Sequence, residues 1–358
     1  MLAHRFGRSP AFSVGLEEEL FVVDAETLAP APVPAGVLDG RRFKAELFTT
    51  MLELNTGVCA GVGEAVAELG ELRLEARRRL RAHGLDLAAA GTWPSAVPEE
   101  QPVTEKAPLR GFAEYAGPSA RRQHCCGLHV HVGVGSPAEC MGRLEAVLPW
   151  LPLVLALSAN SPYLAGAETE LASTRAELLG LLPRSGAPPV FESYDAWARF
   201  AGSLVELGLA DDLMRLWWDV RPHPRLGTLE VRMPDQPTRL AGTAALAALA
   251  QALVAWADPN GPPAHRGVYA QNRWAASRFG RAAGLVHPDG ARLCEPAELL
   301  AELLAQLEPT ADRLGCAGLL AGLEGLDQAG EQLATGRADG LESLSRRLVE
   351  LTYDGLES

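Results

Sequence analysis

Four segments of the chain carry strand-like patterns in which apolar and polar residues alternate. Because successive side chains of a strand point to opposite faces, such alternation predicts a strand with one face toward a core. The four segments are residues 14–24, 46–58, 127–134 and 227–233. A short apolar run at residues 85–92 predicts a fifth, buried strand.

Helical patterns fill much of the remaining chain, which is rich in alanine, leucine and arginine. Residues 64–83 place leucines among many charges and are followed by Gly84, which predicts an amphipathic helix with a glycine stop. Further helices are expected over residues 138–157 (broken near Pro149 and Pro152), 191–218, 238–257 and 296–307, and a helical tail is expected to end near residue 351. Loops are expected at the proline-rich residues 29–36, 94–119 and 183–189.

Strands spread through the chain with helices between them indicate the α+β class, with an antiparallel sheet backed by helices. A chain of 358 residues suits one large domain or two ordinary ones. No shift of composition demands two domains. We therefore expect a single domain over residues 1–358, with a helical C-terminal region from about residue 296.

Composition and charge exclude several classes of protein. With 47% hydrophobic and 22% charged residues, the chain is neither disordered nor fibrous. It carries 32 basic and 45 acidic residues, a formal charge of −13, so it is not expected to bind nucleic acid or an anionic membrane surface. The apolar residues 240–257 are built mostly on alanine and predict a buried helix rather than a membrane span.

Six cysteines are few for this length, and they form no C-x-x-C pair from which a disulfide framework could be predicted. The first ten residues lack the apolar segment of a secretory signal. Both observations favour a reduced, cytoplasmic protein. The apolar helices would permit a homodimer.

The polar faces of the four alternating strands carry ionisable groups. On the first strand Glu17 and Glu19 share one face and Glu18 lies on the other. The same alternation pairs Glu53 with Asn55, His129 with His131, and Glu230 with Thr228 and Arg232. If these strands form one sheet, its polar face holds at least four carboxylates, two imidazoles and a guanidinium.

Carboxylates gathered in a cleft repel one another, and divalent cations offset that repulsion. Carboxylate oxygens favour Mg²⁺, which keeps several waters and is completed by substrate phosphates. Arg232 would suit a transferring phosphoryl group through its fork of donors. Cys125 and Cys126, next to His129 and His131, leave a zinc site open as an alternative, although their spacing is irregular.

Other polar positions have both structural and functional interpretations. Arg221 stands before a proline-rich turn, where it could brace the turn or bind an anionic substrate. Arg175 and Asn272 lie on predicted helices, as anion or substrate ligands or as ordinary surface residues. The sequence contains no P-loop signature, no G-x-G-x-x-G after a strand and no G-x-S-x-G, which disfavours P-loop, Rossmann and α/β-hydrolase sites.

Several long motifs, in order from about residue 12 to residue 310, resemble the type 2 glutamate–cysteine ligase family, and within it the YbdK-like carboxylate–amine ligases. The motifs are GLEEELFVVD (15–24), LELNTGVC (52–59), CGLHVHVGV (126–134), LALSANSPYLAG (155–166), WDVRPHPRLGTLEVRMPDQPT (218–238) and QNRW (271–274). The resemblance implies a glutamine synthetase-like fold, in which an antiparallel sheet curves into a funnel with helices outside. It also implies an enzyme that uses ATP and Mg²⁺ to join a carboxylate, typically the γ-carboxylate of glutamate, to an amine such as cysteine through an acyl phosphate.

The resemblance also implies roles for individual residues. Arg232 would stabilise the moving phosphoryl group, and Glu53 would act both in catalysis and as a metal ligand. The implied metal ligands are Glu17, Glu19, Glu53, His129 and Glu230. The implied nucleotide or substrate ligands are Asn55, His131, Arg221, Arg175 and Asn272.

Two departures from the family pattern bear on substrate choice. Many relatives carry a glutamate where Gln271 stands, and Leu47–Met51 is less polar than in a typical member. Neither change touches the implied metal ligands. Two other functions remain open on the sequence: a zinc hydrolase that uses His129, His131 and Cys125, and a silent protein that binds nucleotide or amino acid without turnover.

Overall fold

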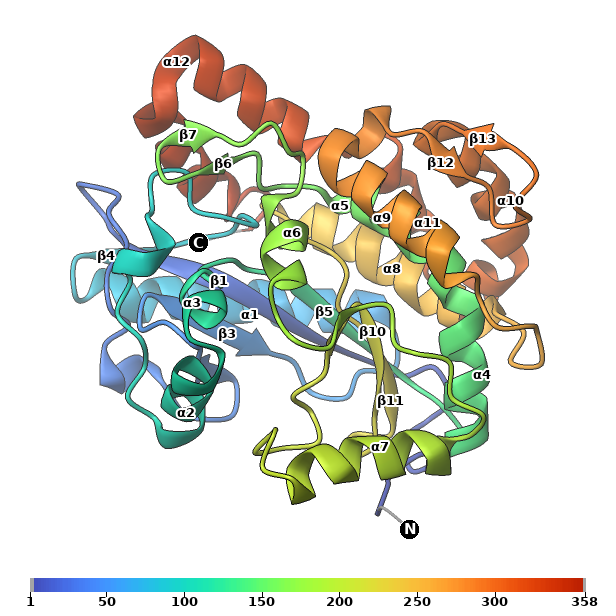
Figure 1. Cartoon of the computed structure of the whole chain (residues 1–358). Coiled ribbons are helices and arrows are strands. Elements are labelled where there is room, and N and C mark those ends of the chain that lie inside the picture. The colour runs from blue at the N-terminus through green and yellow to red at the C-terminus, as the bar shows by residue number, and fades with distance from the viewer. Residues whose placement is uncertain (1–2, 357–358) are drawn as a thin grey trace.

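A computed structural model describes residues 3–356, and its centre is a seven-stranded antiparallel sheet (Figure 1). Along the sheet the strands follow the order β10-β11-β5-β1-β3-β2, and β4 also pairs with β1. The bounds are β1 Val14–Asp24, β2 Phe43–Ala45, β3 Met51–Asn55, β4 Leu85–Ala88, β5 Leu128–Gly133, β10 Val220–His223 and β11 Thr228–Val231. Three two-stranded pairs lie outside it: β6 Tyr163–Leu164 with β7 Ala167–Glu168, β8 Ser185–Gly186 with β9 Trp217–Trp218, and β12 Leu285–Val286 with β13 Leu293–Cys294.

Helices make up much of the chain outside this sheet. They are α1 Val62–Arg81, α2 Ala107–Ala116, α3 Pro118–Arg121, α4 Pro137–Val147, α5 Leu151–Ser158, α6 Thr174–Gly180, α7 Tyr194–Glu206, α8 Leu240–Trp256, α9 Arg266–Phe279, α10 Pro296–Leu314, α11 Ala317–Leu320 and α12 Gln328–Leu351. Short 3-10 turns lie at Ala35–Val37, Pro98–Glu100, Leu148–Trp150, Gly280–Ala282 and Ala321–Leu323. The expected α+β class, an antiparallel sheet backed by helices, is confirmed.

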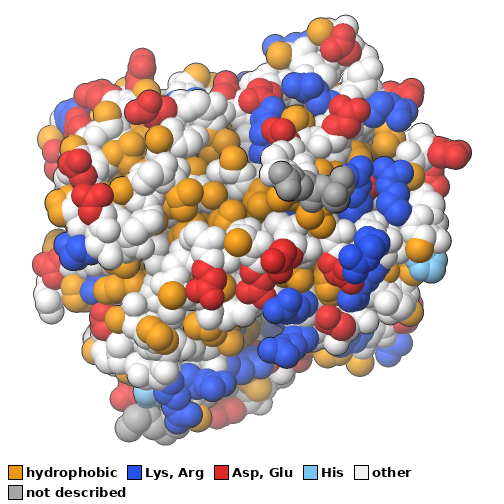
Figure 2. Space-filling model, turned by 180° about the vertical axis from the view of Figure 1, so that it is seen from behind, with side chains coloured by type: hydrophobic (Ala, Val, Ile, Leu, Met, Phe, Trp, Pro, Cys, Tyr) orange, Lys and Arg blue, Asp and Glu red, His pale blue; other side chains and the backbone are white. Residues whose placement is uncertain are grey.

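The apolar face of the sheet packs against α1 and α8. Alternation along β5 sends Leu128, Val130 and Val132 into this core, where each is fully buried. α8, the alanine-rich helix, is buried along nearly its whole length, as its composition predicted. On the face seen from behind, hydrophobic side chains gather near the centre, and acidic and basic side chains are interspersed around them (Figure 2).

The run from α4 through α5, Pro137–Ser158, is by length and composition alone apolar enough to cross a membrane. In its most apolar stretch of 18 residues, 78% is buried inside the structure. The run therefore packs as a core helix of the fold. It is interrupted by a 3-10 turn at Leu148–Trp150, where Pro149 and Pro152 predicted a break.

Three expectations about secondary structure are corrected. The helix expected over 191–218 ends at Glu206, because the chain turns at Gly208 with a positive φ of 70° and then forms β9 and β10. The loop expected over 94–119 contains α2. Its Pro108 lies in the first turn, where backbone N–H groups have no partner within the helix, so the N–H that proline lacks is not missed. The strand expected over 46–58 is shorter, and the unpredicted β2 pairs with it.

Candidate active site

Strand pairing brings the predicted polar residues together on the face opposite α1 and α8. In the register of the sheet, Glu17 of β1 stands beside His129 of β5 and Asn55 of β3. The neighbouring pairs are Glu19 with Glu53, Gly15 with His131, Glu230 with His131, and Glu230 with Arg221. Residues up to 213 positions apart in the chain thus share one polar surface, as the alternation predicted.

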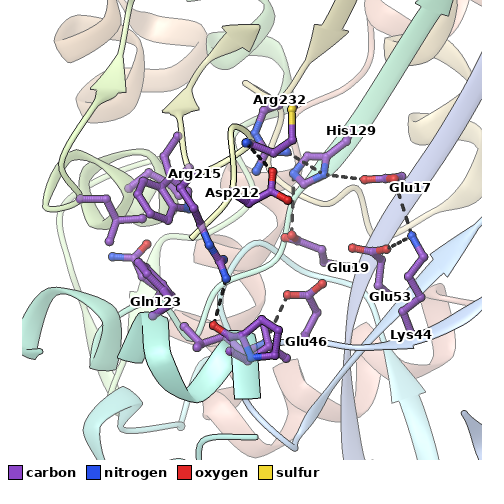
Figure 3. Close-up of a pocket in the computed structure, with 18 of the residues that line it drawn as sticks. Glu17, Glu19, Lys44, Glu46, Glu53, Gln123, His129, Asp212, Arg215 and Arg232 are labelled. Carbon is purple, nitrogen blue, oxygen red and sulfur yellow. Dashed lines mark hydrogen bonds and ion pairs between the residues drawn. The ribbon is translucent and has the colours of Figure 1, made fainter. Parts of the chain in front are cut away.

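Much of this surface, including Glu17, Glu19, Glu53, His129 and Arg221, lines a cavity of about 690 Å³ (Figure 3). The carboxyl groups of Glu17, Glu19, Glu46 and Glu53 turn into it from one side, and Lys44 reaches in beside Glu53. Its wall comes from segments that were predicted as loop or helix, including α2 and residues 211–217. Phe112 of α2 stacks on Trp217, with 4.7 Å between ring centroids, which closes that wall.

The two histidines point their free ring nitrogens at the carboxylates. His129 Nδ1 lies 3.2 Å from Glu17 Oε2, and its Nε2 lies 3.7 Å from Glu19 Oε1. His131 Nδ1 lies 3.0 Å from Thr228 Oγ1, and its Nε2 lies 3.6 Å from Glu17 Oε1. Both Nε2 atoms are buried without a hydrogen-bond partner. Because buried polar atoms are nearly always satisfied, these two nitrogens are candidate ligand atoms.

Charge has shifted the pKa values of this group in opposite directions. Burial alone would raise the pKa of the Glu17 carboxyl, but His131 and His129 hold that pKa well below its ordinary value. Burial, together with the charges of Glu53 and Glu19, raises the pKa of the Glu46 carboxyl well above its ordinary value. Glu46 was not a predicted site residue. Its only signal in the sequence was its place before β3, two residues after Lys44.

Glu230 is fully buried and is bound by two arginines. Arg221 donates to both of its carboxylate oxygens, at 2.6 and 3.1 Å, and Arg232 donates to Oε1. Burial would raise the pKa of Glu230, but Arg221 and Arg232 hold that pKa well below its ordinary value. Arg232 also lies 3.3 Å from His129 Nδ1, so it faces the cluster from the side of β11.

Among the described residues, one group is close enough for its ligand atoms to share a metal ion: Glu17, His131 and Glu230, whose atoms lie within 4.8 Å of one another. A metal ion bound there would compete with Arg221 and Arg232 for the carboxylate of Glu230. No cysteine belongs to this group. Cys125 lines the cavity, but its thiol is not among these ligand atoms, and burial raises the pKa of that thiol to about 12.

The remaining predicted ligands differ in how they meet the cavity. Arg175 lines it, donates to the carbonyls of Arg232 and Met233, and leaves its buried Nε without a partner. Its guanidinium lies so close to Gly127 that a Cβ there would be 2.0 Å from Nη2, which explains the glycine. Asn272 does not line the cavity: its side chain exchanges hydrogen bonds of 2.7 and 2.8 Å with the backbone of Val286.

A second cavity of about 360 Å³ opens at the start of β1. It is lined by Ser13, Gly15, Asn55 and His131, among others. Glu17 and Lys44 line both cavities, so the acid cluster lies where the two meet.

The architecture is shared with solved ligase structures. The glutamate–cysteine ligase of Francisella tularensis, crystallised in complex with AMP, superposes with a TM-score of 0.70 at 14% identity, over 97% of this chain and 90% of that one. The bifunctional glutathione synthetase of Pasteurella multocida gives a TM-score of 0.66 at 15% identity, over 96% of this chain and 53% of that one. At these identities the likeness establishes the fold.

Sequence comparison establishes the family. The sequence model of glutamate–cysteine ligase family 2 matches residues 13–339 of this chain. A Rubrobacter xylanophilus protein with the provisional name glutamate–cysteine ligase 2-3 is 39% identical over 97% of this chain and 99% of its own length. A Sorangium cellulosum protein with the provisional name glutamate–cysteine ligase 2 is 36% identical over 85% of each chain. The chain belongs to glutamate–cysteine ligase family 2.

Proposed function

We propose that the protein is an ATP- and Mg²⁺-dependent ligase that joins the carboxylate of an amino acid to an amine, in the manner of a glutamate–cysteine ligase. The observation that carries this proposal is the convergence of four carboxylates, the His129 imidazole and Arg232 on one cavity, with the His131 imidazole in the adjoining cavity that shares Glu17. The provisional names of the relatives and the AMP complex of the F. tularensis ligase support glutamate, cysteine and adenine nucleotide as ligands.

The donor set fits magnesium better than zinc. Hard carboxylate oxygens dominate it, and Mg²⁺ prefers oxygen ligands with an open face for phosphate. Glu17, His131 and Glu230 already lie close enough to share one ion, and Glu19, Glu53 and His129 would turn their ligand atoms toward the metal when the nucleotide binds. Bound there, magnesium would offset charge on the transferring phosphoryl group.

Arg232 has the electrostatic role. A carboxylate is a poor electrophile because it is already anionic, and phosphorylation by ATP turns it into an acyl phosphate with a good leaving group that an amine can attack. The Arg232 guanidinium faces the cavity beside His129, where it would stabilise charge as the phosphoryl group moves. Glu230, which also binds Arg221, holds Arg232 in place through an ion pair.

Substrate positions follow from the two cavities that meet at Glu17. Asn55 and His131 face the smaller cavity, and Arg175 faces the larger one. Arg175 is anchored by the carbonyls of Arg232 and Met233, with Asp235 3.9 Å away, and its guanidinium at the larger cavity would suit the carboxylate of an amino acid. Holding two substrates at a fixed geometry supplies much of the rate of such a reaction.

The test is release of ADP from ATP across a panel of amino acids and amines. We expect ADP and phosphate only when a carboxylate substrate, an amine and Mg²⁺ are all present, with glutamate and cysteine as the first pair to try. Nucleotide binding without turnover in any mixture would instead indicate a silent binding protein. Stoichiometric zinc that survives dialysis would indicate a hydrolase.

A further inference from the structure

The chain contains only two lysines, Lys44 and Lys106, among its 32 basic residues. Lys44 lies on β2 directly opposite Glu53 of β3, so its ammonium enters the acid cluster from the edge of the sheet. Arginine serves almost everywhere else in this protein, including the ion pairs at Glu18 and Glu230. The use of lysine at this position therefore calls for a physical reason.

The surroundings of Lys44 resemble those of a bound cation. Nζ donates to Glu53 Oε1 at 2.9 Å and to Asn55 Oδ1 at 2.6 Å, and it lies 4.0 Å from Glu17 Oε1. Asn55 in turn donates to the same oxygen of Glu53 at 2.7 Å. The ammonium is a compact point charge, whereas a guanidinium is a planar fork that would not fit among three converging oxygens.

Lys44 is also placed to move without disturbing the sheet. Its side chain is 40% exposed, and it stands where the two cavities meet. A flexible four-carbon stem lets the ammonium leave Glu53 and turn toward an anion in either cavity. No such freedom exists for Arg221, which is buried and bound on all sides by Glu230 and by the carbonyls of Met214 and Leu216.

We propose that Lys44 is a positioning residue that acts through Glu53 and Glu17 to keep the acid cluster weak for free divalent cations, so that metal enters with the nucleotide. While the Lys44 ammonium stays 2.9 Å from Glu53 and 4.0 Å from Glu17, its positive charge opposes a second cation there, so free metal binds poorly. The phosphates of a metal–nucleotide complex would draw the ammonium away from Glu53. This proposal depends on the proposed function for the identity of the nucleotide, but its test does not.

The test is Mn²⁺ binding to the nucleotide-free protein, measured by calorimetry and by the electron paramagnetic resonance signal of free Mn²⁺. Lys44→Met should bind Mn²⁺ at least tenfold more tightly than the parent, or take up one additional ion. Lys106→Met, the same change at the exposed second lysine, should match the parent. Lys44→Gln provides a second variant in case Lys44→Met does not fold.

Unchanged or weakened Mn²⁺ binding in both folded Lys44 variants would overturn the proposal. A purely structural role would lower the melting temperature and would not tighten metal binding. If the parent turns over ATP while Lys44→Met gains no affinity, this proposal fails and the proposed function stands. If Lys44→Met binds Mn²⁺ more tightly but no mixture of substrates yields ADP, the proposal for Lys44 stands and the proposed function fails.

Discussion

Glu18 and Arg73 form a two-pronged ion pair in the core, with Nε and Nη2 of Arg73 donating to the two oxygens of Glu18 at 2.8 and 2.6 Å. Both side chains are fully buried. Glu18 is the middle residue of a run of three glutamates, yet it points away from the two that face the cavity. Thr243 and Gln236 complete its hydrogen bonds. The chemistry of one strand is therefore divided between stability on one face and function on the other.

This division predicts opposite results for two adjacent substitutions. Glu18→Ala leaves Arg73 buried without its partner, which costs about 3–5 kcal/mol of unfolding free energy. Glu19→Ala relieves a crowded cluster of charges but leaves the Gly127 amide without its acceptor, so it should cost less stability than Glu18→Ala, about 1–3 kcal/mol, while it abolishes ADP formation by weakening binding of metal and nucleotide. Urea unfolding and ADP release on both variants measure the two effects. Equal loss of stability in both would contradict the assignment of the faces.

Arg232→Ala should slow phosphoryl transfer without preventing nucleotide binding. Loss of one charge that stabilises the transition state typically lowers kcat by about 10²–10³. Because Glu230 keeps Arg221, the fold should survive. Steady-state kinetics with a separate measurement of ATP affinity distinguishes this result from that of Glu19→Ala. A rate near that of the parent would show that Arg232 does not face the reacting group.

The raised pKa of Glu46 predicts a pH-dependent gain of stability in Glu46→Gln. Below the ordinary carboxyl pKa of 4.5, both proteins carry a neutral side chain and should not differ. As the pH rises through the raised pKa of the folded state, the parent must ionise Glu46 next to Glu53 and Glu19, and it loses stability relative to the variant. Melting temperatures measured in EDTA between pH 5 and 8 should show a difference that grows with pH. A constant difference would contradict the shift.

Cys125→Ser separates the ligase from the zinc alternative. The thiol lines the cavity but is neutral at physiological pH, because burial raises its pKa to about 12. We therefore expect kcat within about threefold of the parent, as for a conservative change that removes no charge. A variant that loses all activity together with bound zinc would favour the hydrolase.

Much of the candidate site could be predicted because it rests on the two-residue period of strands. Alternation placed Glu17 and Glu19 opposite Glu18, and His129 and His131 opposite the valines of β5, and the structure has each of them on its predicted face. Convergence of the four strands on one surface was expected only if they form one sheet, and the structure shows that they do.

The remainder depends on contacts distant in the chain, to which the sequence gives no local signal. Glu46 and Lys44 enter the site because β2 pairs with β3, and β2 is only three residues long. Phe112 and Trp217 meet because α2 folds over the cavity, although prolines around α2 suggested a loop. The side chain of Asn272 forms hydrogen bonds with the backbone of Val286, a partner that sequence spacing alone could not identify.

The most direct test of the account is a crystal structure with Mn²⁺ and a non-hydrolysable ATP analogue, in which anomalous scattering locates the metal. The account predicts Mn²⁺ within about 2.0–2.5 Å of carboxylate oxygens from Glu17, Glu19 or Glu53, with the triphosphate facing Arg232. Metal and nucleotide bound elsewhere on the protein, with these carboxylates unliganded, would contradict it.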